Sequence, residues 1–407
     1  MLPSSLTRLT ASAFASTLLA LTLPATAAPT TAQPAAPAAP AAPAAAPASA
    51  LPAVQAQTWA LYDPAAGKML AAYEAEKRII PASLTKVLTG YIVSEALRDK
   101  KLNPDQMVNV SLNAYRVDKS SSKMYIDPKV PVSIKDLLYG LIIQSGNDAA
   151  VQLAEAVSGT EEAFASVMNK KAAELGMKAS HFENASGLPG AQHYSTSEDL
   201  AVLAARVIKD YPEDYKIYAI KNWAYNKINQ GNRNLLLYTD PTVDGMKTGH
   251  VKESGYNLIA SAKRPSGAGD YRLIAVVTGS ASAKARAADA EKLLSWGYAN
   301  FESVKLAGKD AVVGTPVVWK GMQKSVKGGY ADDRYETVAK GTGDKMKTEV
   351  VMQDKLMAPL AKGAKIGVAK VSYNGKPLAE IPVVALEEVA QAGFFARLID
   401  TVKLWFA

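Results

Sequence analysis

The sequence predicts an α+β domain, in which helices cover an antiparallel sheet, followed by a small domain of nearly all β-structure. Strand-like runs with turn signals stand at both ends of the stretch 55–303, and helical periodicity fills its middle. Beyond about residue 304, short β-like runs alternate with Gly, Pro and Asn-Gly turns. Strands supplied from both ends of a segment, with helices between them, favour one sheet covered by helices.

The first folded elements are a hairpin and a helix. The run "TWALYDPAAGKMLAAYEAEK" places an Asp63-Pro64 turn and Gly67 between two apolar stretches, which predicts a β-hairpin. In "IIPASLTKVLTGYIV", apolar residues then recur at helical spacing: Leu84, Val87, Leu88, Tyr91 and Ile92. Mostly helical signals continue over 112–177.

The later elements complete the domain. A helix is expected from Ser197 to about Lys209, followed by strands in "VDGMKTGHVKESGYNLIASAKR" and "YRLIAVVTGSAS". A last helix, "AKARAADAEKLLSWGYANF", has these inward candidates: Ala288, Leu293, Leu294 and Trp296. In the β-rich region 304–386, Asn374-Gly375 predicts a two-residue hairpin turn.

The amino terminus carries an export signal. Arg8 precedes the apolar run from Ala11 to Leu23, and "PATAA" ends in a small-residue cleavage pattern near Ala27. The run is short for a membrane span, which needs roughly 20 residues. We therefore expect a signal peptide over 1–27, and then a semi-rigid Pro/Ala-rich linker over 28–54.

Composition excludes several classes of site. The 407 residues include no cysteine, so disulfides, thiolate catalysis and cysteine zinc sites are ruled out. His181, His193 and His250 lie far apart without a metal-ligand spacing, so neither a metal nor another cofactor is expected. The net charge of +8 suggests anionic partners such as acidic lipids or carboxylate-bearing polymers, but basic residues form no run typical of nucleic-acid binding.

Three short polar motifs suggest catalysis. They are S-x-x-K at Ser83 and Lys86, S-G-N from Ser145 to Asn147, and K-T-G at Lys247, Thr248 and Gly249. A lysine one turn after a serine can take the hydroxyl proton if the amine is kept neutral. Each motif alone also fits a helix cap, a turn or a solvated lysine. Their order after an export signal is the pattern of serine β-lactamases and penicillin-binding proteins.

The chain resembles the low-molecular-mass penicillin-binding proteins of the D-alanyl-D-alanine carboxypeptidase type. The resemblance runs from about Thr58 to the end, through "PASLTK", "IIQSGNDAAVQLAE", "VDGMKTGH", "GYNLIASA", "EKLLSWGY" and "FFARLIDTVKLWF". It implies a penicillin-recognising, transpeptidase-like domain over 55–303 and a β-rich domain over 304–386. Val251 stands where relatives often carry threonine, and the Pro/Ala linker is not part of the pattern.

The resemblance implies a role for each motif residue. Ser83 would attack the carbonyl between two D-alanines in a peptidoglycan stem pentapeptide, and Lys86 would remove its proton and later activate the deacylating water. Ser145 would relay a proton to the leaving amine. Asn147 would hold the substrate amide and the Lys86 amine. Lys247 would help to keep Lys86 neutral and attract the terminal carboxylate.

The same resemblance extends to the substrate-binding side. Thr248 would bind the carboxylate, and Gly249 would let a ligand or backbone approach closely. The N–H groups of Ser83 and His250 would form the oxyanion hole. Arg286 matches a family arginine near the carboxylate pocket, although an exposed helix residue is an equal alternative.

Other functions are open at this point. A β-lactamase would use the same serine, but no E-x-x-L-N segment lies between Asn147 and Lys247, so β-lactams should acylate the enzyme and inhibit it. An endopeptidase could use the same motifs, although its relatives commonly lack a second domain. A metallopeptidase or a non-catalytic cell-wall-binding protein fits the residues less well.

The carboxyl-terminal segment 387–407 predicts an amphipathic helix. Large apolar residues share one arc of a helical wheel, namely Phe394, Phe395, Leu398, Ile399, Val402, Trp405 and Phe406, and only Leu404 is misplaced. Such a helix would lie on an anionic membrane surface, here the periplasmic face of the cytoplasmic membrane. The alternative is a helix packed on the β-rich domain.

Overall fold

The structure of the protein is a computed structural model that describes residues 50–266 and 269–405. The expected signal peptide, the linker up to residue 49 and Phe406 lie outside the described residues. No helix in the described ranges combines the length and apolar character needed to cross a bilayer.

An antiparallel sheet organises the first domain, with strand order β2-β1-β9-β8-β7. Its strands are β1 (Thr58–Asp63), β2 (Lys68–Tyr73), β7 (Val243–Val251), β8 (Gly255–Ser266) and β9 (Gly269–Ser280). β1 pairs with β9, which brings the start and the end of the domain together, with Leu61 opposite Ala275. The predicted hairpin and the predicted fold class are confirmed.

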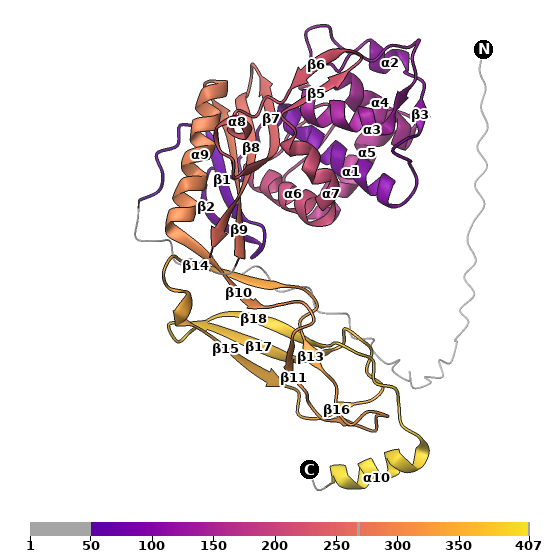
Figure 1. The fold of residues 1–407 in the computed structure, drawn as a ribbon, viewed down its shortest axis with the longest axis vertical. Helices are drawn as coiled ribbons and strands as arrows, with labels where there is room; N and C mark the ends of the chain where they lie inside the picture. Colours follow the sequence, from indigo (N-terminus) through magenta and orange to yellow (C-terminus); the bar gives the residue numbers. More distant parts are fainter. Residues whose placement is uncertain (1–49, 267–268, 406–407) are drawn as a thin grey trace, which may run out of the picture. The chain divides into compact units, whose positions relative to one another are not determined.

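One face of the sheet is covered by α9 (Ala283–Asn300) (Figure 1). Trp59 and Leu61 belong to the core beneath α9, whereas Ala60, between them, belongs to the core on the other face. This division follows from the alternation of side chains along a strand. The prediction for α9 was wrong at Ala288, which is exposed, because the buried alanines are its neighbours Ala287 and Ala290.

A helical layer covers the other face. Its helices are α1 (Lys86–Arg98), α2 (Leu112–Tyr115), α3 (Ile134–Tyr139), α4 (Asn147–Ser158), α5 (Glu161–Leu175), α6 (Ser197–Asp210) and α7 (Pro212–Tyr215). Two small two-stranded sheets, β3–β4 (Met107–Val108, Val132–Ser133) and β5–β6 (Asn222–Tyr225, Ile228–Gly231), and the single-turn α8 (Leu236–Thr239) complete this region.

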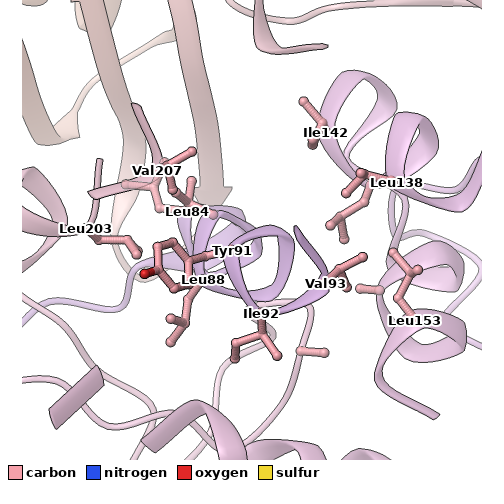
Figure 2. Close-up of a cluster of buried hydrophobic side chains, with 14 of the residues drawn as sticks. Leu84, Leu88, Tyr91, Ile92, Val93, Leu138, Ile142, Leu153, Leu203 and Val207 are labelled. Atoms are coloured by element: carbon pink, nitrogen blue, oxygen red, sulfur yellow. The ribbon is translucent and has the colours of Figure 1, made fainter. Parts of the chain in front are cut away.

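Helix α1 is the centre of this layer. Figure 2 shows its Leu88 and Ile92 among side chains that include Leu138 of α3 and Leu203 of α6. Truncating one such buried leucine to alanine costs about 2–5 kcal/mol. The packing therefore fixes the position of α1, and with it the start of the helix at Lys86.

The second domain is nearly all β-structure with its own core. Its main sheet has the order β11-β13-β18-β17-β15. The strands are β10 (Phe301–Ala307), β11 (Val312–Gly314), β12 (Val318–Trp319), β13 (Gly328–Gly329), β14 (Arg334–Ala339), β15 (Met346–Met352), β16 (Leu356–Met357), β17 (Lys365–Tyr373) and β18 (Lys376–Ala385). Asn374 and Gly375 join β17 to β18 with φ values of 50° and 75°, so the predicted hairpin turn is confirmed. Helix α10 (Phe394–Leu404) follows.

Candidate active site

The three motifs meet at one cavity of about 540 Å³. Its lining includes Ser83 from the first motif, Ser145 and Asn147 from the second, and Thr248 and Gly249 from the third. A larger hollow, of about 770 Å³, is lined by residues from the range 51–77 and contains none of the motif residues. The cavity with the motifs is therefore the candidate active site.

Ser83 lies in a 3₁₀ turn, Ala82–Thr85, immediately before α1. Ala82 has a φ of +50°, a strained conformation for a residue with a side chain, and such strain is common beside functional groups. The turn and the helix place Lys86 Nζ 3.0 Å from Ser83 Oγ. The lysine is thus within proton-transfer distance of the serine.

Two carbonyl oxygens also surround the Lys86 amine. Lys86 Nζ donates to Asn147 Oδ1 at 2.8 Å and to the carbonyl oxygen of Ser186 at 2.6 Å. Both partners can only accept hydrogen bonds. A neutral amine has two N–H groups and one lone pair, so these two acceptors take both N–H groups and leave the lone pair for the hydroxyl of Ser83. The predicted contact between Asn147 and Lys86 is present.

The surroundings of Lys86 favour its neutral form. Burial, and after it the positive charge of Arg233, lower its pKa from 10.5 to about 7, against the opposing charges of Asp148 and Glu161. The sequence predicted Lys247 as the neighbouring positive charge, and Arg233 is a second one that the sequence did not predict. At neutral pH a large fraction of Lys86 can therefore act as a base.

The second motif is placed by an irregular helix end. A π-helical turn, Gly140–Gln144, follows α3, and Ser145 then adopts the left-handed conformation with a φ of 64° before α4 begins at Asn147. Helical irregularities of this kind are frequent at functional sites. Among the described residues the Ser145 hydroxyl has no hydrogen bond to Lys86 or Ser83. Ser145 lines the cavity together with Ser83 and Asn147.

Asp148 fixes the wall beside this motif. Its carboxylate is buried and accepts hydrogen bonds from the backbone N–H groups of Met124 at 2.9 Å and Tyr125 at 2.8 Å. The N–H of Asn147 donates to the carbonyl oxygen of Ser122 at 2.7 Å. The cavity is also lined by Ser120, Ser121 and Ser122, which we call the serine-rich loop. These bonds attach this loop to the start of α4.

The third motif lies on β7, an edge strand of the sheet. A Cβ added at Gly249 would lie 2.9 Å from the carbonyl oxygen of Pro81. Only glycine therefore lets β7 come this close to the turn Ala82–Thr85 that carries Ser83, the nucleophile turn. Lys247 is buried and donates to the carbonyl oxygen of Thr248 at 3.1 Å. Burial and the nearby charge of Lys86 hold the pKa of Lys247 well below its usual range.

Two arginines complete the cavity. Arg286 is buried and donates to the carbonyl oxygen of Gly249 at 3.0 Å, so the alternative of an exposed helix residue was wrong. Burial lowers its pKa to about 10. Arg233 donates to Ser122 Oγ at 2.7 Å, and sequence reasoning missed it because it stands in a loop that matches no motif. The lining residues include no aspartate or glutamate, which favours an anionic ligand.

The last predicted residue, His250, is exposed at the mouth of the cavity, and its ring centroid lies 4.1 Å from that of Tyr256. All nine predicted residues thus come from one region around Ser83. The additional groups are Arg233 and the carbonyl of Ser186, and a backbone carbonyl leaves no signal in a sequence motif.

Comparison with known proteins agrees with this geometry. Residues 44–282 match the family model described as D-alanyl-D-alanine carboxypeptidase. The chain belongs to this family. Residues 301–391 match a second model, the C-terminal domain of penicillin-binding protein 5.

Several relatives of this carboxypeptidase family member are similar over most of its length. D-alanyl-D-alanine carboxypeptidase DacA of Haemophilus influenzae is 41% identical, with 87% of this chain and 90% of the relative covered. DacC of Escherichia coli is 40% identical, with 87% and 89% covered. The crystal structure of penicillin-binding protein 5 from Haemophilus influenzae is 40% identical, covers 84% of this chain and 100% of its own, and has a TM-score of 0.77.

Proposed function

We propose that the protein is a serine-type D-alanyl-D-alanine carboxypeptidase that removes the terminal D-alanine from peptidoglycan stem pentapeptides. The observation that carries this proposal is the Lys86 amine, which lies 3.0 Å from Ser83 Oγ and has two carbonyl oxygens as its other partners. In the neutral amine these two acceptors take both N–H groups, and the lone pair is left for Ser83. A histidine-free nucleophile of this kind suits acyl transfer. The names of the relatives support the same activity.

The chemistry proceeds through an acyl-enzyme. Neutral Lys86 accepts the hydroxyl proton as Ser83 Oγ bonds to the carbonyl carbon between the two D-alanines. The C–N bond then breaks, a proton passes to the leaving nitrogen, and free D-alanine departs. Water next attacks the ester with Lys86 as base, and Ser83 recovers its proton as the carboxylate product leaves.

The cationic lining suits the free carboxylate that marks the end of the substrate. Thr248 and Lys247 on β7 would bind this carboxylate, together with Arg286, which donates to a carbonyl oxygen of the same strand, and Arg233, which lines the same cavity. The N–H groups of Ser83 and His250 would stabilise the oxyanion, because Gly249 holds β7 against the nucleophile turn. Ser145 would relay the proton to the leaving amine.

A β-lactamase is the alternative that uses the same serine. The lining residues include no carboxylate that could activate a deacylating water, so a β-lactam should remain bound as an ester. A solved relative, penicillin-binding protein D2 of Listeria monocytogenes, is described in a cefotaxime-bound form; it is 31% identical, covers 60% of this chain and 98% of its own, and has a TM-score of 0.55. β-Lactams are therefore expected to inhibit this protein.

Mass spectrometry of the purified protein separates these functions. The protein and its Ser83→Ala variant are incubated with a stem pentapeptide and, separately, with penicillin. Release of one D-alanine and a persistent penicilloyl adduct on Ser83, both lost in the variant, are the expected results. Rapid penicillin turnover with intact pentapeptide would identify a β-lactamase, cleavage only of cross-linked dimers an endopeptidase, and no reaction a binding protein.

We also propose that the protein is exported and attached peripherally to the periplasmic face of the cytoplasmic membrane by α10. Its polar side faces the β-rich domain: Asp400 is buried and accepts from the N–H of Lys320 at 2.7 Å and from Lys324 Nζ at 3.0 Å. Leu404, one turn beyond Asp400, is half-buried on this same side, which accounts for its misfit on the wheel.

The apolar side of α10 is left to solvent, with Phe395 78% and Trp405 79% exposed. A helix packed for stability would bury this side, so its exposure supports a lipid surface as partner. Co-sedimentation with anionic vesicles tests this. Phe395→Ser should weaken binding about tenfold or more, whereas Val351→Ser, which alters an exposed residue on β15, should leave it unchanged. Equal binding by both variants would refute the attachment.

A further inference from the structure

The loop that supplies the Ser186 carbonyl is shaped by its own side chains. Asn184 Oδ1 accepts hydrogen bonds from the backbone N–H groups of Ser186 at 3.2 Å, Gly187 at 2.7 Å and Leu188 at 3.1 Å. Thr89 Oγ1 of α1 donates to the carbonyl oxygen next to this turn, that of residue 185, at 2.7 Å. These bonds fix the local shape of the loop. Its position relative to the turn Ala82–Thr85, which carries Ser83, depends on a further contact.

His193 provides that link. Its Nδ1 accepts the backbone N–H of Glu183 at 3.2 Å, which places the ring proton on Nε2. Nε2 then donates to Thr85 Oγ1 at 2.9 Å. Thr85 is the last residue of the Ser83 turn and directly precedes Lys86, and both Thr85 and His193 are buried. The imidazole thus joins the start of the loop to the nucleophile turn.

We propose that His193 is a positioning residue for the reaction, which holds the Ser186 carbonyl on the Lys86 amine by joining Thr85 to the loop. The inference rests on the proposed function, in which the lone pair of Lys86 must face Ser83. If the carbonyl withdraws, one Lys86 N–H loses its acceptor and the amine is free to rotate. The lone pair then no longer has a single direction.

The neutral Nε2–H tautomer is the working form of this link. Protonation would place a second proton on Nδ1, against the N–H of Glu183, so the two donors would face each other. The charged or titratable groups that act on the ring are the side chains of Glu183, His181 and Lys86. Burial is the largest influence and lowers the pKa of His193 to about 4, so the link persists at neutral pH.

Penicillin acylation of the full protein tests the proposal, because mass spectrometry gives the rate constant of the molecules that react, whatever fraction is folded. His193→Asn keeps an acceptor for Glu183 but loses the bond to Thr85, whereas His193→Gln can retain the donor to Thr85. Thr85→Val removes the acceptor from the other side. We expect His193→Asn and Thr85→Val each to slow acylation about tenfold, the double variant to lose no more than either single variant, and His193→Gln to retain more activity than His193→Asn.

A pH profile adds a readout that a purely structural role would not move. A carbonyl acceptor stabilises the ammonium form of Lys86, so its loss should lower the pKa of Lys86. The acidic limb of the profile, in which the acylation rate rises with pH, should then move to lower pH. Additive losses in the double variant, or variants that only lower the melting temperature with an unchanged rate constant and limb, would overturn the proposal. A wild-type protein that is never acylated at Ser83 would instead overturn the proposed function.

Discussion

The rate of Ser83 acylation should follow the neutral fraction of Lys86. An amine with the ordinary lysine pKa of 10.5 is only about 0.03% neutral at pH 7, whereas one with a pKa of about 7 is about half neutral. The buried site thus supplies roughly a thousandfold more base, which corresponds to about 5 kcal/mol of destabilisation of the ammonium form.

The informative perturbation is Arg233→Gln, which removes the positive charge that acts on Lys86. Without this charge the pKa of Lys86 rises and the acidic limb of the profile moves to higher pH. At an effective dielectric constant of about 20, a unit charge roughly 15 Å away contributes on the order of 1 kcal/mol, and an effect of this size would move the limb by somewhat under one pH unit. Arg233→Lys keeps the charge and is the matched control.

The assay is the second-order rate constant of penicillin acylation, followed by intact-protein mass spectrometry between pH 5 and pH 9. The wild-type rate should rise about tenfold per pH unit at the acidic end and level off near pH 7. A wild-type rate that still rises tenfold per unit through pH 9 would contradict a neutral Lys86. An identical limb in Arg233→Gln and Arg233→Lys would contradict the assignment of the charge effect.

Three further predictions follow from buried contacts. Gly187→Ala should abolish penicillin labelling and lower the free energy of unfolding by several kcal/mol, because the new Cβ would lie 1.8 Å from a carbonyl oxygen of the nucleophile turn. The control is Gly176→Ala, whose Cβ would have nothing within 4 Å, and it should cost about 1 kcal/mol in thermal unfolding. Asp148→Asn should cost about 1–3 kcal/mol in urea unfolding, because its new NH₂ group would face N–H donors of the segment 124–126. The pKa of His193 is lowered from 6.5 to about 4 in the folded protein, so on acidification the unfolded chain binds the proton first. The free energy of unfolding should therefore fall by up to about 3 kcal/mol as the pH drops from 6.5 to 4. His193→Gln should flatten this pH dependence.

The sequence could indicate which side chains the structure brings together around Ser83, because each sits in a short pattern with a local structural cause. Ser83 and Lys86 share a face because they are three residues apart at a helix start, and Asn147 begins α4 directly after a turn. Strand alternation and the Asn374-Gly375 turn predicted the sheet and the hairpin for equally local reasons.

What the sequence could not predict depends on tertiary approach. Arg233 reaches the cavity only because its loop folds against the serine-rich loop at Ser122, and no periodicity records that contact. The wheel of α10 correctly divided its two faces, but it could not tell which face meets the β-rich domain. That choice is made by Asp400, through the backbone N–H of Lys320 and the ammonium of Lys324, and these lie about eighty residues away in the chain.

The charge distribution explains why an unliganded site of this kind can be both basic and reactive. Lys86, Lys247, Arg233 and Arg286 share one region, the lining of the cavity includes no acid, and the charges of Asp148 and Glu161 only partly offset this excess at Lys86. Burial and mutual repulsion therefore lower the pKa of each lysine in the free protein. A substrate carboxylate bound beside Lys247 would favour the charged form of that lysine, while Lys86, turned toward carbonyl oxygens and Ser83, would stay available as the base. The terminal carboxylate would then act as more than a handle for binding, because its charge would separate the protonation states of two otherwise similar lysines.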